Sequence, residues 1–155
     1  MSAPRPLIRD LERSRAEIVL AVLALAGIVA ILAMAAIYYW KQAETSRDPG
    51  GLIQIVALSV VIYAGMTLAS RFPHRFNYPW AITEVNARRQ YTLSRRMLTM
   101  LKLAVVLLFI FMTLAELEAA MGKDWGLAII LVVVLQIPIL GTIVGSYIVK
   151  ASRET

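Results

Sequence analysis

Four long stretches without a charged side chain constrain this chain more than any other feature of its sequence. The first is Ile18–Trp40, with 23 residues. A helix rises about 1.5 Å per residue, so this stretch spans about 34 Å as a helix, enough to cross the hydrocarbon core of a bilayer. These stretches are apolar on every side, whereas a membrane β-barrel needs alternating polar and apolar residues. The sequence therefore predicts membrane-spanning helices.

Three further stretches complete the predicted architecture. The third contains Lys102, which we expect to extend its ammonium group to the membrane interface. The fold class is therefore expected to be all-α, a polytopic integral membrane protein with four transmembrane helices in a single membrane domain, residues 1–155. The expected spans lie at about residues 18–40, 52–69, 97–117 and 127–149.

The composition agrees with this class and excludes several kinds of chemistry. Hydrophobic residues make up 59% of the chain and charged residues 17%, against about 45–50% and about 25% in soluble domains. The absence of cysteine excludes disulfides, thiolate metal sites and a cysteine nucleophile. The one histidine, His74, lacks co-ligands, and no phosphate-binding glycine loop or serine nucleophile elbow is present. We expect a protein that is not an enzyme and binds no cofactor or metal.

The distribution of lysine and arginine predicts the orientation in the membrane. Of the 16 cations, 13 fall in the two terminal tails and in the segment from the second span to Lys102. The opposite side holds three, which are Lys41, Arg47 and Lys123. Because cations accumulate on the cytoplasmic side, we expect a multi-pass protein of the cell membrane with both termini in the cytoplasm.

Residues 70–96, between the second and third spans, form a predicted basic cytoplasmic arm. Its first part contains two prolines and four aromatic residues, which favours an extended or turning backbone at headgroup level. Thr83 resembles a helix N-cap, and Glu84 would lie in the favourable first turn. We expect a helix that starts at about residue 84 and continues into the third span.

Four arginines of this expected helix share one arc of its surface. They are Arg88, Arg89, Arg95 and Arg96, and Trp80 precedes them as an aromatic anchor. Cations near an anionic membrane surface gain about 1 kcal/mol each, so contact with anionic lipid headgroups is one interpretation. An acidic protein partner is the other. Nucleic acid is not an expected partner because no nucleic-acid-binding module accompanies the charge.

The fourth span carries signals for helix packing. Pro138 predicts a kink, and Gln136 can bond to freed backbone groups or to a neighbouring helix. Gly141 and Gly145 are spaced for close contact between helices. A broken-helix substrate site, as in transporters, is the functional alternative for this region, although only one such helix is present. Glu116 could serve as a cation or proton site, but a solvated helix end is the favoured interpretation.

The arm also carries a resemblance to a family. The phrase from Ser70 to Pro79, followed by Ile82-Thr83-Glu84-x-Asn86-Ala87-x-x-Gln90-Tyr91, resembles small prokaryotic membrane proteins with domain of unknown function 1648. The likeness covers about residues 52–120. The outer-loop motif of that family, a Pro-x-His-Phe-Asn-like phrase, is not evident in residues 41–51. The family has no established general activity, and some of its members resemble immunity proteins against a secreted peptide.

These observations favour an accessory or interaction subunit that packs beside other membrane helices. Its expected partners are anionic membrane lipids and either other membrane subunits or a second copy of the chain. The alternatives are an immunity or resistance factor against a secreted peptide, which the resemblance implies, and a small transporter-like protein.

The orientation is testable with reporter fusions. Alkaline phosphatase is active only outside the cytoplasm, so a fusion after Thr155 should be inactive and an insertion near Asp48 active. Activity at the first position together with silence at the second would contradict the predicted topology.

Overall fold

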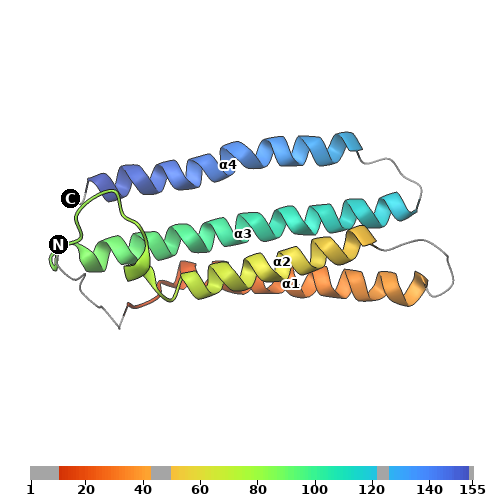
Figure 1. The fold of residues 1–155 in the computed structure, drawn as a ribbon, viewed down its shortest axis with the longest axis horizontal. Coiled ribbons are helices and arrows are strands. Elements are labelled where there is room, and N and C mark those ends of the chain that lie inside the picture. Colours follow the sequence, from red (N-terminus) through yellow and green to blue (C-terminus); the bar gives the residue numbers. More distant parts are fainter. Residues whose placement is uncertain (1–10, 43–49, 122–125, 154–155) are drawn as a thin grey trace.

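The chain folds as four long helices that run side by side along one axis (Figure 1). The computed structural model describes residues 11–42, 50–121 and 126–153. The helices are α1 (Arg15–Gln42), α2 (Gly50–Ala69), α3 (Ala87–Ala120) and α4 (Gly126–Ser152), and a short 3-10 helix, η1 (Pro73–Arg75), follows α2. All four long helices have the length and apolar composition to cross a membrane. The predicted all-helical class with four candidate spans is therefore confirmed.

Helix α3 is the centre of this arrangement, because α1, α2 and α4 all pack against it. The main hydrophobic core joins α1 to α3 through Ala24, Ile28 and Ile31 on one side and Val106 and Phe109 on the other. Partly buried residues of α2 cover the same cluster, whereas α4 contributes no side chain to it. The fold is thus a three-helix core with α4 attached along the far side of α3, as Figure 1 shows.

The start of α3 differs from the sequence prediction. The helix begins at Ala87 rather than at residue 84, and it then runs unbroken to Ala120. Thr83 instead caps a turn before the helix: its N–H donates to Asn86 Oδ1 at 2.9 Å, and its Oγ1 accepts from the Asn86 N–H at 3.4 Å. These reciprocal bonds have the form of a capping box. The Ala87 N–H also donates to the Thr83 carbonyl at 2.9 Å, so this turn leads directly into the regular helix.

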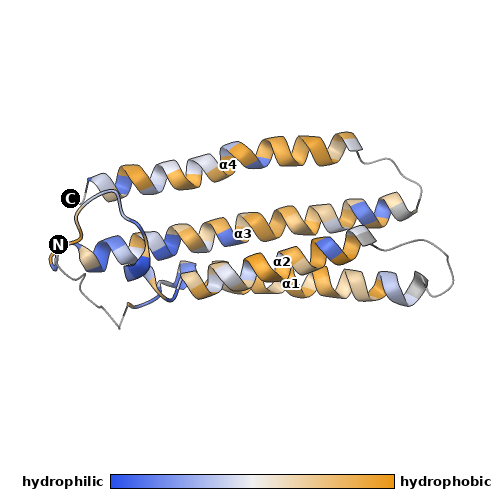
Figure 2. Ribbon diagram, in the orientation of Figure 1, coloured by the Kyte–Doolittle hydropathy of each residue, from blue (hydrophilic) through white to orange (hydrophobic). Residues whose placement is uncertain are grey.

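The arm, residues 70–96, packs against one end of the bundle. The Tyr78 hydroxyl donates to the Pro73 carbonyl at 2.9 Å, and the Tyr78 ring lies 5.9 Å from that of Tyr91 on α3. The start of α1 and the end of α4 lie at this same end, where hydrophilic residues gather (Figure 2). The loops expected to hold Arg47 and Lys123 at the opposite end lie outside the described residues.

Gly27 allows the close approach of α1 to α3. A Cβ atom built at this position would overlap Val106 Cγ1 and lie 3.2 Å from Ile110 Cδ1. Val106 is 2% exposed and its β-branched side chain is held in one rotamer on a helix, so it cannot move aside cheaply. The distance between α1 and α3 in the core therefore depends on glycine, which has no side chain, at position 27.

Replacing Gly27 with valine should therefore destabilise the fold. We expect a loss of about 1–3 kcal/mol in the free energy of unfolding, as for other overpacked cores. The matched control is Gly65→Val on α2, where a Cβ meets nothing within 4 Å. Unfolding in mixed micelles, followed by circular dichroism, measures both variants. Equal stability of the two would show that α1 and α3 do not need this close approach.

Candidate functional site

A pocket of about 240 Å³ lies between α1, α2 and α3 at the end of the bundle that carries the arm. Its wall contains three cations, one carboxylate and several hydroxyl groups, next to an apolar stretch of α1. The polar lining includes Arg13, Glu17, Thr67, Arg95, Thr99 and Lys102. Within the described ranges, no group of three His, Cys, Asp or Glu side chains is placed to hold a metal ion. The arrangement is chemically suited to an anion.

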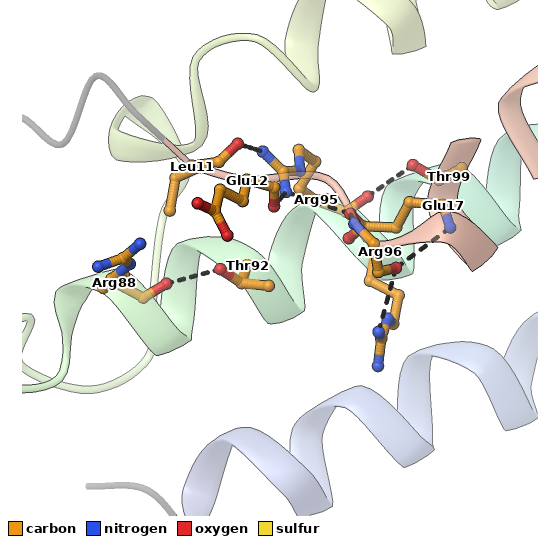
Figure 3. Close-up of polar contacts among 9 residues, drawn as sticks. Leu11, Glu12, Glu17, Arg88, Thr92, Arg95, Arg96 and Thr99 are labelled. Atoms are coloured by element: carbon orange, nitrogen blue, oxygen red, sulfur yellow. Dashed lines mark hydrogen bonds and ion pairs between the residues drawn. The ribbon is translucent and has the colours of Figure 1, made fainter.

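Arg95 forms one side of the pocket and is 7% exposed. Its Nη1 donates to the Leu11 carbonyl at 2.8 Å, and its Nη2 donates to the Glu12 carbonyl at 2.6 Å and to Glu17 Oε2 at 3.1 Å (Figure 3). The guanidinium group thus ties the segment before α1 to α3. A buried charge of this kind is tolerated only when paired and hydrogen-bonded, as it is here.

Glu17 has a second role at the start of α1. Its Oε2 accepts from the Ser14 N–H at 3.0 Å, and its own N–H donates to Ser14 Oγ at 3.2 Å. This is a capping box at the N-terminus of α1, where a carboxylate also interacts favourably with the helix dipole. One buried carboxylate, 3% exposed, therefore caps α1 and pairs with Arg95 on α3.

Lys102 reaches from α3 to α2 at the other side of the pocket. Its Nζ donates to Thr67 Oγ1 at 3.2 Å and lies 5.0 Å from the centre of the Tyr63 ring. Thr67 and Tyr63 are four residues apart on α2, so they share one face of that helix. The Lys102 side chain is 5% exposed because it packs against α2, and its expected extension to the membrane interface stays a prediction.

The four arginines predicted to share one role do not have one environment. Arg88, Arg89 and Arg96 are exposed, and Arg96 Nη2 makes one bond to Ser14 Oγ at 3.3 Å. Arg95 is buried in contacts within the chain, so the expectation that it turns toward lipid or a partner is corrected. The physical reason is that the segment before α1 lies across this part of the arc and covers it (Figure 3).

Trp80, which is expected to contact lipid or a partner, also packs against another helix of this chain. It is half-buried, and its ring lies 6.3 Å from that of Tyr147 on α4. Tyr147 in turn shares a 3.1 Å hydrogen bond with Ser94 on α3. Trp80 therefore helps to hold the arm against α4.

Polar bonds attach α4 to α3. Gln136 Nε2 donates to the Ala104 carbonyl at 2.8 Å, and Gln90 Nε2 donates to the Ala151 carbonyl at 2.8 Å. The bond from Gln136 is of the kind expected from the sequence, namely a bond to a neighbouring helix. Pro138 lies inside α4, which continues on both sides of it.

The two glycines of α4 contact no other helix in the described part of this chain. A Cβ at Gly141 or at Gly145 would meet nothing within 4 Å. The expected packing of this face therefore stays a prediction, and it requires a helix from another molecule.

Sequence reasoning missed the residues that form the pocket around Lys102. One signal was present, because an ionisable residue inside an apolar span is by default a candidate functional group. The partners Tyr63 and Thr67, together with Arg13, could not be identified from their spacing because they come from different segments of the chain.

The comparisons with known proteins add no family to these observations. No family model, no curated protein and no solved structure matches the chain. The resemblance of the arm to domain of unknown function 1648 therefore stays a prediction.

The buried ion pair generates a stability prediction. Replacing Arg95 with leucine leaves the Glu17 carboxylate buried and unpaired, so we expect a loss of about 3–5 kcal/mol in unfolding free energy. The exposed Arg88 is the matched control, and Arg88→Leu should change stability by no more than about 0.5 kcal/mol. A double Arg95→Leu/Glu17→Leu variant should recover part of the loss. Similar unfolding curves for the two single variants would refute the role assigned to the pair.

Proposed function

We propose that this chain is an accessory or interaction subunit of the cell membrane, with a binding rather than a catalytic role. Its α4 would pack against a helix of another membrane protein or of a second copy of the chain. The observation that carries the proposal is the isolation of α4 from the hydrophobic core, since the buried residues of α4 are only Gln136 and Ala151.

The exposed surface of α4 supports this role. Large apolar side chains are exposed along the helix; they are Leu127, Ile130, Leu131, Val133, Val134, Leu135, Ile137, Ile139, Val144, Ile148 and Val149. In a bilayer such side chains can face lipid at no cost, so hydrophobicity alone does not drive helices together. Close contact between helix backbones favours association, and Gly141 and Gly145 leave open space for such contact on α4.

The orientation proposed with this role has both termini and the arm in the cytoplasm. It is supported by the position of the arm at the same end of the bundle as the start of α1 and the end of α4 (Figure 1). The exposed side chains of Arg88, Arg89 and Arg96 would then lie near the anionic headgroups of the inner leaflet.

A Gly145→Leu variant tests the proposed packing face. The larger side chain should force the partner backbone away and reduce recovery of the associated complex after gentle detergent extraction, by about tenfold. The measurement is stoichiometric co-purification with a tagged chain, with the assembly mass separating a second copy from another protein. The control is Gly65→Leu on α2, which also has open space around it. Unchanged recovery with Gly145→Leu would mean that this face of α4 is lipid-exposed.

A further inference from the structure

The pocket between α1, α2 and α3 combines a cationic end with an apolar side. At its polar end, Arg13 and Lys102 both line the pocket. Along its side run Ile18, Val22 and Leu25, which are 48%, 58% and 51% exposed and lie on one face of α1 at helical spacing. A ligand that matches both parts carries a negative charge at one end and an apolar chain at the other.

The cation with free hydrogen-bonding capacity is Lys102 rather than Arg95. Both terminal nitrogens of Arg95 are engaged by the segment before α1 and by Glu17. An ammonium group has three donors, and in the described part of the chain Lys102 uses one, to Thr67 Oγ1. Lys102 is also nineteen-twentieths buried, so an anion in the pocket would meet a positioned, largely dehydrated charge.

The position of the pocket along the helices matches a lipid lying in the bilayer. Thr67 is two residues from the end of α2 at Ala69, so the ammonium group of Lys102 lies at the end of the apolar span. Tyr63 and Leu25 lie about one turn or more farther from this end of their helices. The charged end therefore lies at headgroup level, and the apolar side leads toward the middle of the membrane.

We propose that this pocket binds one anionic membrane lipid, with the headgroup phosphate on Lys102 and Arg13 and an acyl chain along Ile18, Val22 and Leu25 of α1. The site is distinct from the exposed arginines of the arm, which would meet headgroups without a pocket. It is also independent of α4, so it does not rest on the proposed accessory role.

Native mass spectrometry of the full chain in detergent tests the proposal with three probes. They are dioleoyl phosphatidylglycerol, dioleoyl phosphatidylcholine and inorganic phosphate. Both lipids carry a phosphate, but phosphatidylcholine also carries a quaternary ammonium that would lie near Lys102 and Arg13. We expect one phosphatidylglycerol molecule to bind at least about tenfold more tightly, because it has no such cation to be repelled. Inorganic phosphate should neither bind detectably nor displace the lipid, because it lacks the acyl chain.

Two variants locate the site, and each has a different physical effect. Lys102→Gln removes the charge and should weaken phosphatidylglycerol binding at least about tenfold, whereas Lys150→Gln, on an exposed lysine of α4, should not. Ala21→Trp fills the pocket without changing any charge and should also block the lipid. Circular dichroism on each variant tests whether the bundle is folded. If Lys102→Gln does not fold, lipid binding by Ala21→Trp decides whether the pocket is the site.

Three results would overturn the proposal. Equal binding of the two lipids would mean that the headgroup charge is not recognised. Binding of inorganic phosphate that competes with the lipid would assign the pocket to a free anion. Retention of lipid by folded Lys102→Gln or Ala21→Trp would place the lipid elsewhere on the protein.

Discussion

The buried polar side chains of α3 determine where every other helix lies. Arg95 bonds to the segment before α1, Lys102 to α2, and Gln90 to the end of α4. Groups of this kind are costly to bury without a partner, so each favours the packing in which a neighbouring segment supplies one. Apolar contacts in a bilayer select weakly between one helix neighbour and another, because lipid tails are as apolar as leucine. Polar contacts at set heights along α3 therefore specify which helix packs on which side.

The α1–α3 core and the attached helix α4 are held together by different kinds of contact. Helices α1 and α3 meet over a small-residue contact at Gly27 and share a packed apolar core. Helix α4 is held by hydrogen bonds to α3: Gln136 donates to the Ala104 carbonyl, the Ala151 carbonyl accepts from Gln90, and Tyr147 shares a bond with Ser94. Such bonds contribute about 1 kcal/mol each in membranes, so few contacts within the chain compete with the packing proposed for α4.

The pocket follows from the same polar contacts. Pairing with Glu17 keeps Arg95 at the wall and lets one carboxylate both cap α1 and neutralise a buried cation. Lys102 and Arg13 are the other two cations that line the pocket. A structural ion pair and the proposed lipid site thus lie side by side, and they are separable experimentally because different variants affect each.

The four apolar spans and the unbroken helix that joins the arm to the third span could be predicted from the sequence, and the bond from Gln136 to a neighbouring helix is one of the two outcomes that the sequence allowed. They follow from local properties: the length of apolar runs, helical periodicity and the bonding capacity of a buried amide. The burial of Arg95 could not be predicted from the sequence, because Arg95 and Arg88 occupy equivalent positions on a helical wheel. Only the tertiary structure brings Leu11, Glu12 and Glu17 across that one arginine and joins Lys102 to Thr67 on another helix. Periodicity determines the face on which a residue lies, whereas its partner depends on how distant segments pack.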